Sequence, residues 1–211
     1  MTDIERPKSD TVIPCWSCKG PVSARALFCS TCSAVQPPGQ IDHFARLGMG
    51  RAFAVDPVEL DHQYFGFQRR LHPDRFATRS VKERALSQQQ ATALNEAYET
   101  LKEPLKRAAY LLRLAGRPAD IEHSATVDDP SLLMEAMEMR EALADAQGID
   151  EVTALTAKAD AEVSDCQRAL AAAFAADDLD LAGSLTTRLK YLRRLADEAC
   201  ARKKRLTRPN A

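Results

Sequence analysis

The sequence predicts an all-α fold, and three features of the chain support that class. Only eight of the 211 residues are Gly and 6% are aromatic, whereas Ala, Leu, Glu and Arg are abundant, a composition that suits helices better than sheets. Apolar residues recur at spacings of three and four over most of the chain, as they do on one face of a helix. Pro57, Pro104 and Pro130 each stand where a first helical turn would begin. Together these features predict several helices joined by short connections.

A helix with a clear beginning and end is predicted in the first half of the chain. Asp56 and Pro57 provide an N-cap and a first helical residue, and apolar residues follow at helical spacing as far as Leu71. The helix must end near Leu71, because His72 precedes Pro73 and the residue before a proline is disfavoured in the α region.

A second helix completes a hairpin with the first. It begins at Ser80, where Glu83 completes a capping box, and it runs to about Leu101. Between the helices, the loop at 72–79 presents His72-Pro73-Asp74 on a corner that two packed helices brace, so its imidazole and carboxylate can face a partner. An ordinary helix stop is the alternative for so short a motif. The remaining part of this region is a short helix that Pro104 opens and Gly116 can cap.

Three further helical segments, at 131–146, 150–176 and 179–206, suit a three-helix bundle. One face of the first carries an apolar and acidic strip, made of Leu133, Met134, Met137, Glu138 and Glu141. Acidic residues outnumber basic ones from 135 to 151, so an exposed strip here would suit a basic partner. Burial of the methionines in the core is the alternative. The basic run at 202–205 is interpreted as a solvated helix end.

Four of the six cysteines form a pattern typical of a metal site. They make two Cys-x2-Cys pairs ten residues apart, Cys15 with Cys18 and Cys29 with Cys32. Each pair can sit on a tight turn whose thiolates converge on one ion, and four protein ligands leave no position for water. The pattern therefore predicts a structural Zn2+. Two disulfides, uncoordinated thiols and a rubredoxin-like iron site stay open as alternatives, since sulfur ligands alone do not fix the metal.

Composition limits the partners and the compartment that we expect. The chain carries 29 Lys+Arg and 30 Asp+Glu, a formal net charge of -1, which gives no general attraction to nucleic acid or anionic lipid. The longest uncharged apolar run, at 169–176, is far shorter than the roughly 20 residues of a membrane span. Residues 1–14 resemble neither a signal peptide nor an organellar presequence. We therefore expect a cytoplasmic protein, or a matrix protein if it is a processed organellar form, with no nucleic-acid and no membrane partner.

Four segments carry a family resemblance: Asp42 to Gly48 (DHFARLG), Phe67 to Phe76 (FQRRLHPDRF), Leu94 to Lys102 (LNEAYETLK) and Leu132 to Glu141 (LLMEAMEMRE). They resemble the J-domain co-chaperones and, within them, the HscB family of iron–sulfur cluster assembly proteins. The resemblance covers about residues 42–206. Together, the residue patterns and the resemblance predict six segments: a disordered N-terminus at 1–14, a four-cysteine zinc knuckle at 15–33, a linker at 34–41, a J-domain at 42–116, a linker at 117–129 and a three-helix scaffold-binding domain at 130–211.

The resemblance also implies two protein partners. A DnaK/HscA-type ATPase would be contacted by His72, Pro73 and Asp74, with Arg69, Arg70 and Arg75 supplying positive charge. An IscU-type iron–sulfur scaffold protein would bind Leu133, Met134, Met137, Glu138, Glu141, Asp145 and Tyr191. Met137 stands where leucine is usual in the family and Tyr191 where phenylalanine is common, and both replacements keep the bulk of the patch.

No motif in the chain predicts catalysis. The four His residues do not pair with acids at catalytic spacing, and no Gly-rich phosphate loop is present. We therefore expect a non-enzymatic adaptor that delivers the scaffold to the ATPase and stimulates its ATP hydrolysis. A general J-protein for unfolded clients is the second interpretation, although the chain lacks the Gly/Phe linker of that class. A zinc-ribbon nucleic-acid-binding protein is the third, and it would need more basic and aromatic residues near the cysteines.

Overall fold

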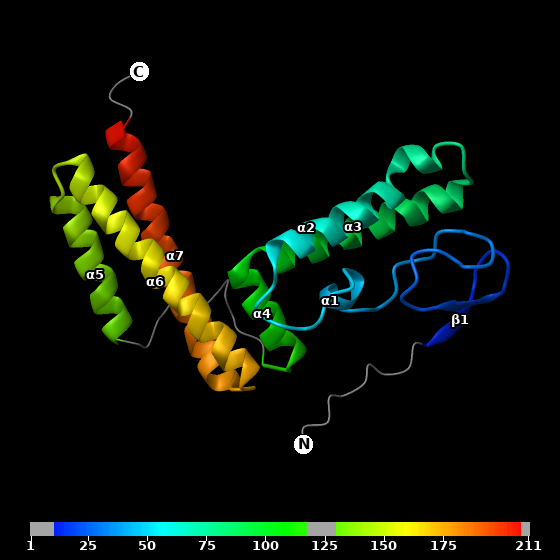
Figure 1. The fold of residues 1–211 in the computed structure, drawn as a ribbon, viewed down its shortest axis with the longest axis horizontal. Helices are drawn as coiled ribbons and strands as arrows, with labels where there is room; N and C mark the ends of the chain where they lie inside the picture. The colour runs from blue at the N-terminus through cyan, green and yellow to red at the C-terminus, as the bar shows by residue number, and fades with distance from the viewer. Residues whose placement is uncertain (1–10, 118–129, 208–211) are drawn as a thin grey trace. The chain divides into compact units, whose positions relative to one another are not determined.

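The computed structural model describes residues 11–117 and 130–207, and these ranges are mostly helical, which confirms the predicted class (Figure 1). The elements are β1 (Val12–Pro14), β2 (Pro21–Ser23), α1 (His43–Arg46), α2 (Pro57–Leu71), the 3-10 helix η1 (Pro73–Phe76), α3 (Val81–Lys102), α4 (Pro104–Leu114), α5 (Pro130–Asp145), α6 (Ile149–Ala175) and α7 (Leu179–Thr207). The linker predicted at 117–129 lies outside the described residues except for Arg117. So do residues 1–10 of the segment predicted to be disordered.

The chain divides into two compact units. Of the described residues, the first unit holds 11–51 and 55–102, and the second holds 52–54, 103–117 and 130–207. The first unit therefore contains the cysteine segment with α1, α2 and α3, whereas α4 packs with α7 in the second. None of the helices in the described ranges is long and apolar enough to cross a membrane.

The first unit begins with a small antiparallel hairpin of β1 and β2, in which Ile13 pairs with Val22. Val12–Pro14 thus forms a strand, although these residues belong to the segment predicted to be disordered. The physical reason is local packing. Ile13 lies against a small buried cluster of Cys15, Val22 and Cys29. Alternate residues of a strand point to the same side, so an extended chain brings both Ile13 and Cys15 to this cluster. The cysteine segment therefore has a hairpin and a buried centre of its own.

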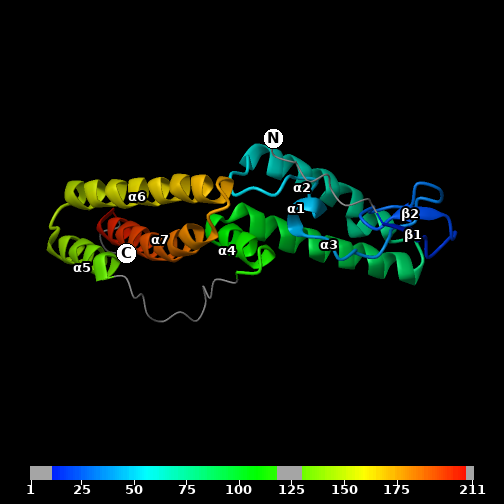
Figure 2. The same ribbon diagram turned by 90° about the horizontal axis from the view of Figure 1, so that it is seen from below.

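The two long helices of the first unit, α2 and α3, lie side by side as an antiparallel pair (Figures 1 and 2). Asp56 caps α2 as predicted, with its Oδ1 accepting from the Val58 N–H at 2.9 Å. The Tyr64 and Tyr98 rings stack across the pair with centroids 3.9 Å apart, and the Tyr98 hydroxyl donates to Asp61 at 2.8 Å. These contacts fix the register of the hairpin along its length.

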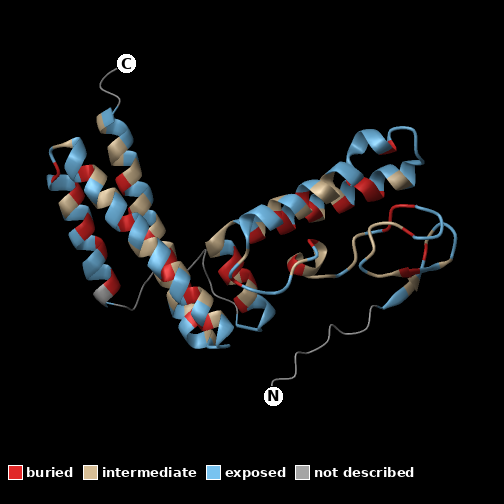
Figure 3. Cartoon of the chain, viewed as in Figure 1, coloured by how far each residue is buried: buried red, intermediate tan, exposed pale blue. Residues whose placement is uncertain are grey.

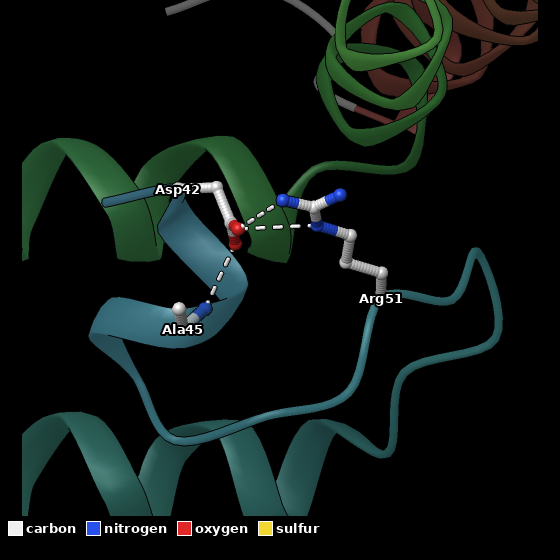
Figure 4. Close-up of polar contacts among 3 residues, drawn as sticks. All are labelled: Asp42, Ala45 and Arg51. Carbon is white, nitrogen blue, oxygen red and sulfur yellow. Dashed lines mark hydrogen bonds and ion pairs between the residues drawn. The ribbon is translucent and has the colours of Figure 1, made fainter. Parts of the chain in front are cut away.

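Asp42 fixes the short helix α1 within the first unit (Figure 4). One carboxylate oxygen accepts from the Ala45 N–H at 2.9 Å and caps the helix, while the other lies 2.7 Å from Nη2 of Arg51. Partial burial acts to raise the pKa of Asp42, but the Ala45 hydrogen bond and the Arg51 charge outweigh it and hold that pKa below its usual value.

The second unit contains two apolar clusters along the long α6–α7 hairpin. One cluster joins Phe53 and the α4 residues Ala108 and Leu112 to α6 and α7, and the Phe53 ring stacks on Phe174 with centroids 5.6 Å apart. The other cluster joins Met139 and its neighbours on α5 to the opposite ends of α6 and α7. Buried and exposed residues accordingly alternate along α5, as Figure 3 shows, because one of its faces packs on the hairpin.

Candidate functional site

The four predicted cysteine ligands lie together in the first unit. Their Sγ atoms are all within 4.8 Å of one another, with 3.8 Å between Cys15 and Cys32 and 3.7 Å between Cys18 and Cys29. A disulfide needs about 2.05 Å between sulfurs, so the disulfide alternative is not realised, and all six cysteines are free thiols. Four sulfurs about 2.3 Å from one ion would form a tetrahedron with edges of about 3.8 Å. The cluster therefore has the dimensions of a tetrahedral metal site.

The surroundings of Cys15 and Cys29 favour the ionised form of these two thiols. Burial opposes ionisation of Cys15, but hydrogen bonds from the backbone of Cys18 and Ser17 and from the Gln36 side chain outweigh it and lower the pKa of Cys15 to about 6. Backbone hydrogen bonding at Cys32 likewise lowers the pKa of Cys29. At Cys18 the Gly20 backbone N–H lowers the pKa, but the neighbouring thiols and burial raise it to about 11. Thiolates are the metal-binding form of cysteine, so Cys15 and Cys29 are the positions at which the surroundings already favour metal binding.

The His72-Pro73-Asp74 corner protrudes from the end of the α2–α3 hairpin. His72 ends α2 with an extended ψ of 132°, as expected before proline, and Pro73 then starts η1. The side chains of His72 and Asp74 are 56% and 90% exposed, and the Asp74 N–H donates to Nδ1 of His72 at 3.4 Å.

The base of this corner is held by α3. The Ser87 hydroxyl donates to the carbonyl of Leu71 at 2.8 Å inside the hairpin, and Phe76 is buried beneath η1. Arg69, Arg70 and Arg75, the predicted positive residues, are all exposed around the tripeptide. The structure therefore gathers the predicted ATPase-binding residues on one solvent-facing end of the hairpin.

Sequence reasoning missed a set of contacts that joins the cysteine segment to this hairpin. The guanidinium of Arg70 lies 4.9 Å from the centre of the Phe28 ring, and Nζ of Lys82 lies 4.3 Å from the centre of the Trp16 ring. These pairs are far apart in sequence, and no periodicity in either segment indicates them. The one signal in the sequence is the presence of Trp16 and Phe28 beside the cysteines, since aromatic rings attract the cationic groups of Lys and Arg.

A buried hydrogen bond adds a third link between the cysteine segment and α3. Nε2 of Gln90 donates to the Gln36 carbonyl at 2.9 Å, and both glutamines are almost fully buried. The Gln36 side chain in turn donates to the Cys15 sulfur at 3.4 Å. A continuous chain of hydrogen bonds thus runs from a cysteine of the cluster to the core face of α3.

The predicted strip on α5 lies on the surface of the second unit. Leu133, Met134 and Met137 expose 44%, 63% and 62% of their area. Glu138, Glu141 and Asp145 are exposed as well. The buried residues of α5, Leu132, Ala136, Met139 and Leu143, occupy the opposite face of the helix. The alternative that Met134 and Met137 belong to the core therefore does not hold.

Tyr191 of α7 lies at the border of the same surface. Arg188 and Glu198 of α7 form ion pairs with Glu135 and Arg140 of α5, at 2.6 Å and 3.0 Å. Tyr191 follows Arg188 by three residues and precedes Glu198 by seven, so it shares the face of α7 that borders α5. Its side chain is half-buried there.

Comparison with known proteins agrees with this arrangement. Residues 128–199 match a family model described as the HSCB C-terminal oligomerisation domain. The iron–sulfur cluster co-chaperone HscB of Mus musculus is 35% identical over 87% of this chain and 80% of its own length. A co-chaperone HscB homologue of Paraburkholderia xenovorans is 38% identical over 74% of this chain and 90% of its own length. The crystal structure of the human co-chaperone HscB is similar with a TM-score of 0.80 and 32% identity, covering 90% of this chain and 98% of that one.

The helical hairpin with its exposed tripeptide, together with these relatives, defines a J-domain co-chaperone. The chain belongs to the HscB family of iron–sulfur cluster co-chaperones. This result confirms the resemblance drawn from the sequence and the main functional interpretation. The kinds of partner that such a co-chaperone implies are a chaperone ATPase and a scaffold protein.

Proposed function

We propose that this protein binds an IscU-type iron–sulfur scaffold through its second unit, delivers it to a DnaK/HscA-type ATPase through its first, and stimulates ATP hydrolysis by that partner. The observation that carries the proposal is that one chain presents both an exposed tripeptide corner and an exposed apolar strip bordered by acids. An adaptor needs two such surfaces, because it must hold both partners at once. We place this activity in the bacterial cytoplasm, with the mitochondrial matrix as the organellar equivalent.

On the ATPase side, the contacts that alter the conformation of the ATPase come from His72, Pro73 and Asp74. Electrostatic attraction to the ATPase comes from Arg69, Arg70 and Arg75. The tripeptide does no chemistry of its own. It acts by binding one conformation of the ATPase better than another, which shifts that partner's equilibrium and lowers its barrier to hydrolysis. A corner held by Ser87 and Phe76 suits this role, because a rigid contact loses little entropy on binding.

On the scaffold side, the apolar anchors are Leu133, Met134, Met137 and Tyr191, and the charged rim is Glu138, Glu141 and Asp145. Flexible methionine side chains can fill irregular gaps in a partner surface. The carboxylates steer a basic partner toward the strip and fix its orientation.

For the cysteine cluster we infer a structural Zn2+ held by Cys15, Cys18, Cys29 and Cys32. All four positions of a tetrahedral ion are then taken by protein sulfur, so the ion supplies a cross-link rather than a reactive centre. A segment with so small a core needs such a cross-link to fold.

The ATPase arm of the proposal is tested by His72→Gln. Steady-state ATP turnover of a purified DnaK/HscA-type ATPase is measured with the parent and with the variant, in the presence of an IscU-type scaffold. We expect His72→Gln to remove the stimulation while circular dichroism and scaffold affinity stay unchanged, since the His72 side chain is exposed. Parental stimulation by this variant would contradict the assignment of the corner.

The scaffold arm is tested by the double charge reversal Glu138→Lys plus Glu141→Lys. We expect weaker binding of an IscU-type scaffold, with a deficit that shrinks at high salt because rim charges act over distances that salt screens. Asp160→Lys is the control, since Asp160 is an exposed acid on α6 outside the strip. Equal loss in the control would move the scaffold site away from α5.

A further inference from the structure

A basic pocket lies between the cysteine segment and the tripeptide end of the α2–α3 hairpin, within the first unit. It encloses about 350 Å³ and is lined by Phe28, Ser33, Arg70, Arg75, Phe76, Arg79 and Glu83. Two of these residues come from the cysteine segment, and the other five surround the His72-Pro73-Asp74 corner. Arg70 and Arg75 already belong to the predicted ATPase-binding set, but no residue from the cysteine segment does, so the proposed function leaves that wall of the pocket without a role.

The wall from the cysteine segment is positioned by the backbone around the four cysteines. Phe28 directly precedes the buried Cys29, and the Leu27 carbonyl accepts from the Gln36 N–H at 2.9 Å. Ser33 has a positive φ of 59°, and its N–H donates to the Cys29 carbonyl at 2.9 Å to close the turn after Cys32. Because Phe28 and Ser33 flank the second cysteine pair, the position of this wall depends on the fold of the cluster.

The opposite wall is strongly basic and is also held in place. The Arg84 guanidinium donates to the carbonyls of Ala77 and Arg79, at 3.4 Å and 3.1 Å, which fixes the loop that carries Arg79. Glu83 is the single acid of the pocket, and its carboxylate already accepts from the hydroxyl of Ser80 at 3.0 Å. Three arginines against one carboxylate give the pocket a net positive charge.

The ring of Phe28 gives the pocket a second kind of contact. The Arg70 guanidinium lies over this ring, so the arginine is oriented by the cysteine segment and not only by α2. A planar guanidinium held this way can donate two parallel hydrogen bonds to a carboxylate. The ring itself offers apolar surface to the methylene groups of an acidic side chain.

We propose that the basic pocket binds an acidic segment of the ATPase partner, so that the cysteine segment is part of the ATPase-docking surface. The inference rests on the proposed function and extends it by a second contact. Charge complementarity selects the occupant, since an Asp- or Glu-bearing segment matches three arginines and one aromatic ring. Position selects the partner, because Arg70 and Arg75 flank the tripeptide and anything seated on the tripeptide lies beside the pocket.

Two variants test the pocket in the full chain. Affinity for a purified DnaK/HscA-type ATPase is measured by isothermal titration at low and high salt. Phe28→Ala removes the ring, and Arg79→Glu reverses one charge on a side chain that the fold does not use. We expect each to weaken binding by about tenfold, as lost contacts of about 1.4 kcal/mol do, and Arg79→Glu to flatten the salt dependence. Lys106→Glu, an exposed charge reversal on α4, is the matched control and should bind like the parent.

Metal dependence is the third arm. Cys29→Ser should weaken ATPase binding to the same extent as Phe28→Ala, because both displace the same wall. Metal content and thermal unfolding of Phe28→Ala establish that its cysteine cluster is intact. Parental affinity in both Phe28→Ala and Arg79→Glu overturns the pocket.

His72→Gln separates the two levels of failure. If His72→Gln removes stimulation while the pocket variants behave like the parent, the pocket is wrong and the proposed function stands. If the parent itself neither binds nor stimulates the ATPase, both the proposed function and the pocket are overturned.

Discussion

At the scale of single residues, several side chains in this protein satisfy two neighbours at once. Asp42 caps α1 and pairs with Arg51. The Gln36 side-chain amide donates to the Cys15 sulfur at 3.4 Å and to the Ala34 carbonyl at 2.8 Å. Such residues are sensitive positions, because removing one side chain leaves more than one partner without its hydrogen bond.

Replacing Asp42 separates its two roles. Asp42→Ala loses both the cap and the ion pair and should cost about 1 kcal/mol of stability, whereas Asp42→Asn keeps an N-cap acceptor and should cost less. Both values come from chemical denaturation at neutral pH. A larger loss for Asp42→Asn than for Asp42→Ala would contradict the assignment of the cap as the main contribution.

The acid stability of the first unit should depend on the same residue. The pKa of Asp42 is lower in the folded protein than its usual value, so its stabilisation is present above the unfolded pKa and disappears as pH falls through the folded one. Denaturation curves between neutral and strongly acidic pH should show this loss in the parent. In Asp42→Asn, the part of this loss of stability that comes from Asp42 should be absent. If stability falls equally with pH in both proteins, Asp42 makes no contribution to the acid stability.

The exposure of single methionines could not be settled from the sequence. On α5 both faces carry large apolar residues, with Leu132, Met139 and Leu143 on one and Leu133, Met134 and Met137 on the other. Periodicity therefore finds no unique stripe, and the family resemblance alone indicated which face is free. The packing of α5 on the α6–α7 hairpin determines which of the two faces is buried.

Truncation of these methionines gives a contrast within one helix. Met134→Ala plus Met137→Ala should change stability by less than about 0.5 kcal/mol, since both side chains face solvent, but should weaken scaffold binding by about 2 kcal/mol or more. Met139→Ala, at a buried position of the same helix, should instead cost roughly 2 to 5 kcal/mol of stability. Urea denaturation measures the stability of each variant, and titration with the scaffold measures its binding. Together they distinguish the double variant from Met139→Ala. Normal binding by the folded double variant would remove the scaffold site from this strip.

At the scale of elements, the sequence predicted helices well where a cap and a proline mark them. The predicted ends of α2 at Pro57 and Leu71 agree with the structure, and the capping box of Ser80 and Glu83 forms as expected. The β1–β2 hairpin was missed, because strands of three residues carry too little pattern to be distinguished from irregular chain. The gathering of four cysteines in one place was predictable from their spacing alone. The contacts of the cysteine segment with α2 and α3 were not predictable, since aromatic and cationic partners distant in sequence leave no local signal.

Metal removal from the cysteine segment has a convenient reporter. Trp16 is the only tryptophan in the chain, and its indole N–H donates to the Val35 carbonyl at 2.7 Å. Cys29→Ser should lower the metal content from one zinc per chain to none and shift tryptophan emission to longer wavelength as the segment loosens. Cys166→Ser is the control, because Cys166 is packed in the core of the second unit. Unchanged metal stoichiometry in Cys29→Ser would show that the four cysteines are not the ligands.

At the scale of the whole molecule, the compact units do not follow the order of the sequence motifs. The family resemblance places α4 at the end of a J-domain ending near residue 116, and that boundary stays a prediction. By packing, however, α4 belongs with α6 and α7, and it brings Phe53 into the same cluster. Sequence patterns gave no sign of this, because an amphipathic helix shows that it buries a face but not against which partner.

Two leucines of equal burial make the division testable. Leu94 of α3 and Leu112 of α4 are each 1% exposed. Each change to Ala should cost roughly 2 to 5 kcal/mol, with the loss confined to its own unit. Hydrogen exchange should therefore show faster exchange in α2 and α3 for Leu94→Ala and in α6 and α7 for Leu112→Ala. Loss of protection in α2 and α3 from Leu112→Ala would contradict this division.

The packing of α4 also sets where the chain can be cut or recombined. A fragment that stops at residue 116 retains Phe53, Ala108 and Leu112 but loses the α6 and α7 residues that cover them, including Leu170 and Leu189. Such a fragment exposes a hydrophobic surface, and we expect it to self-associate at the concentrations used for spectroscopy. Chimaeras that exchange the α2–α3 hairpin between co-chaperones should therefore be joined at Lys102, with Phe53 replaced by a polar residue. The boundary near residue 116, which the sequence motifs predict, is the less suitable junction.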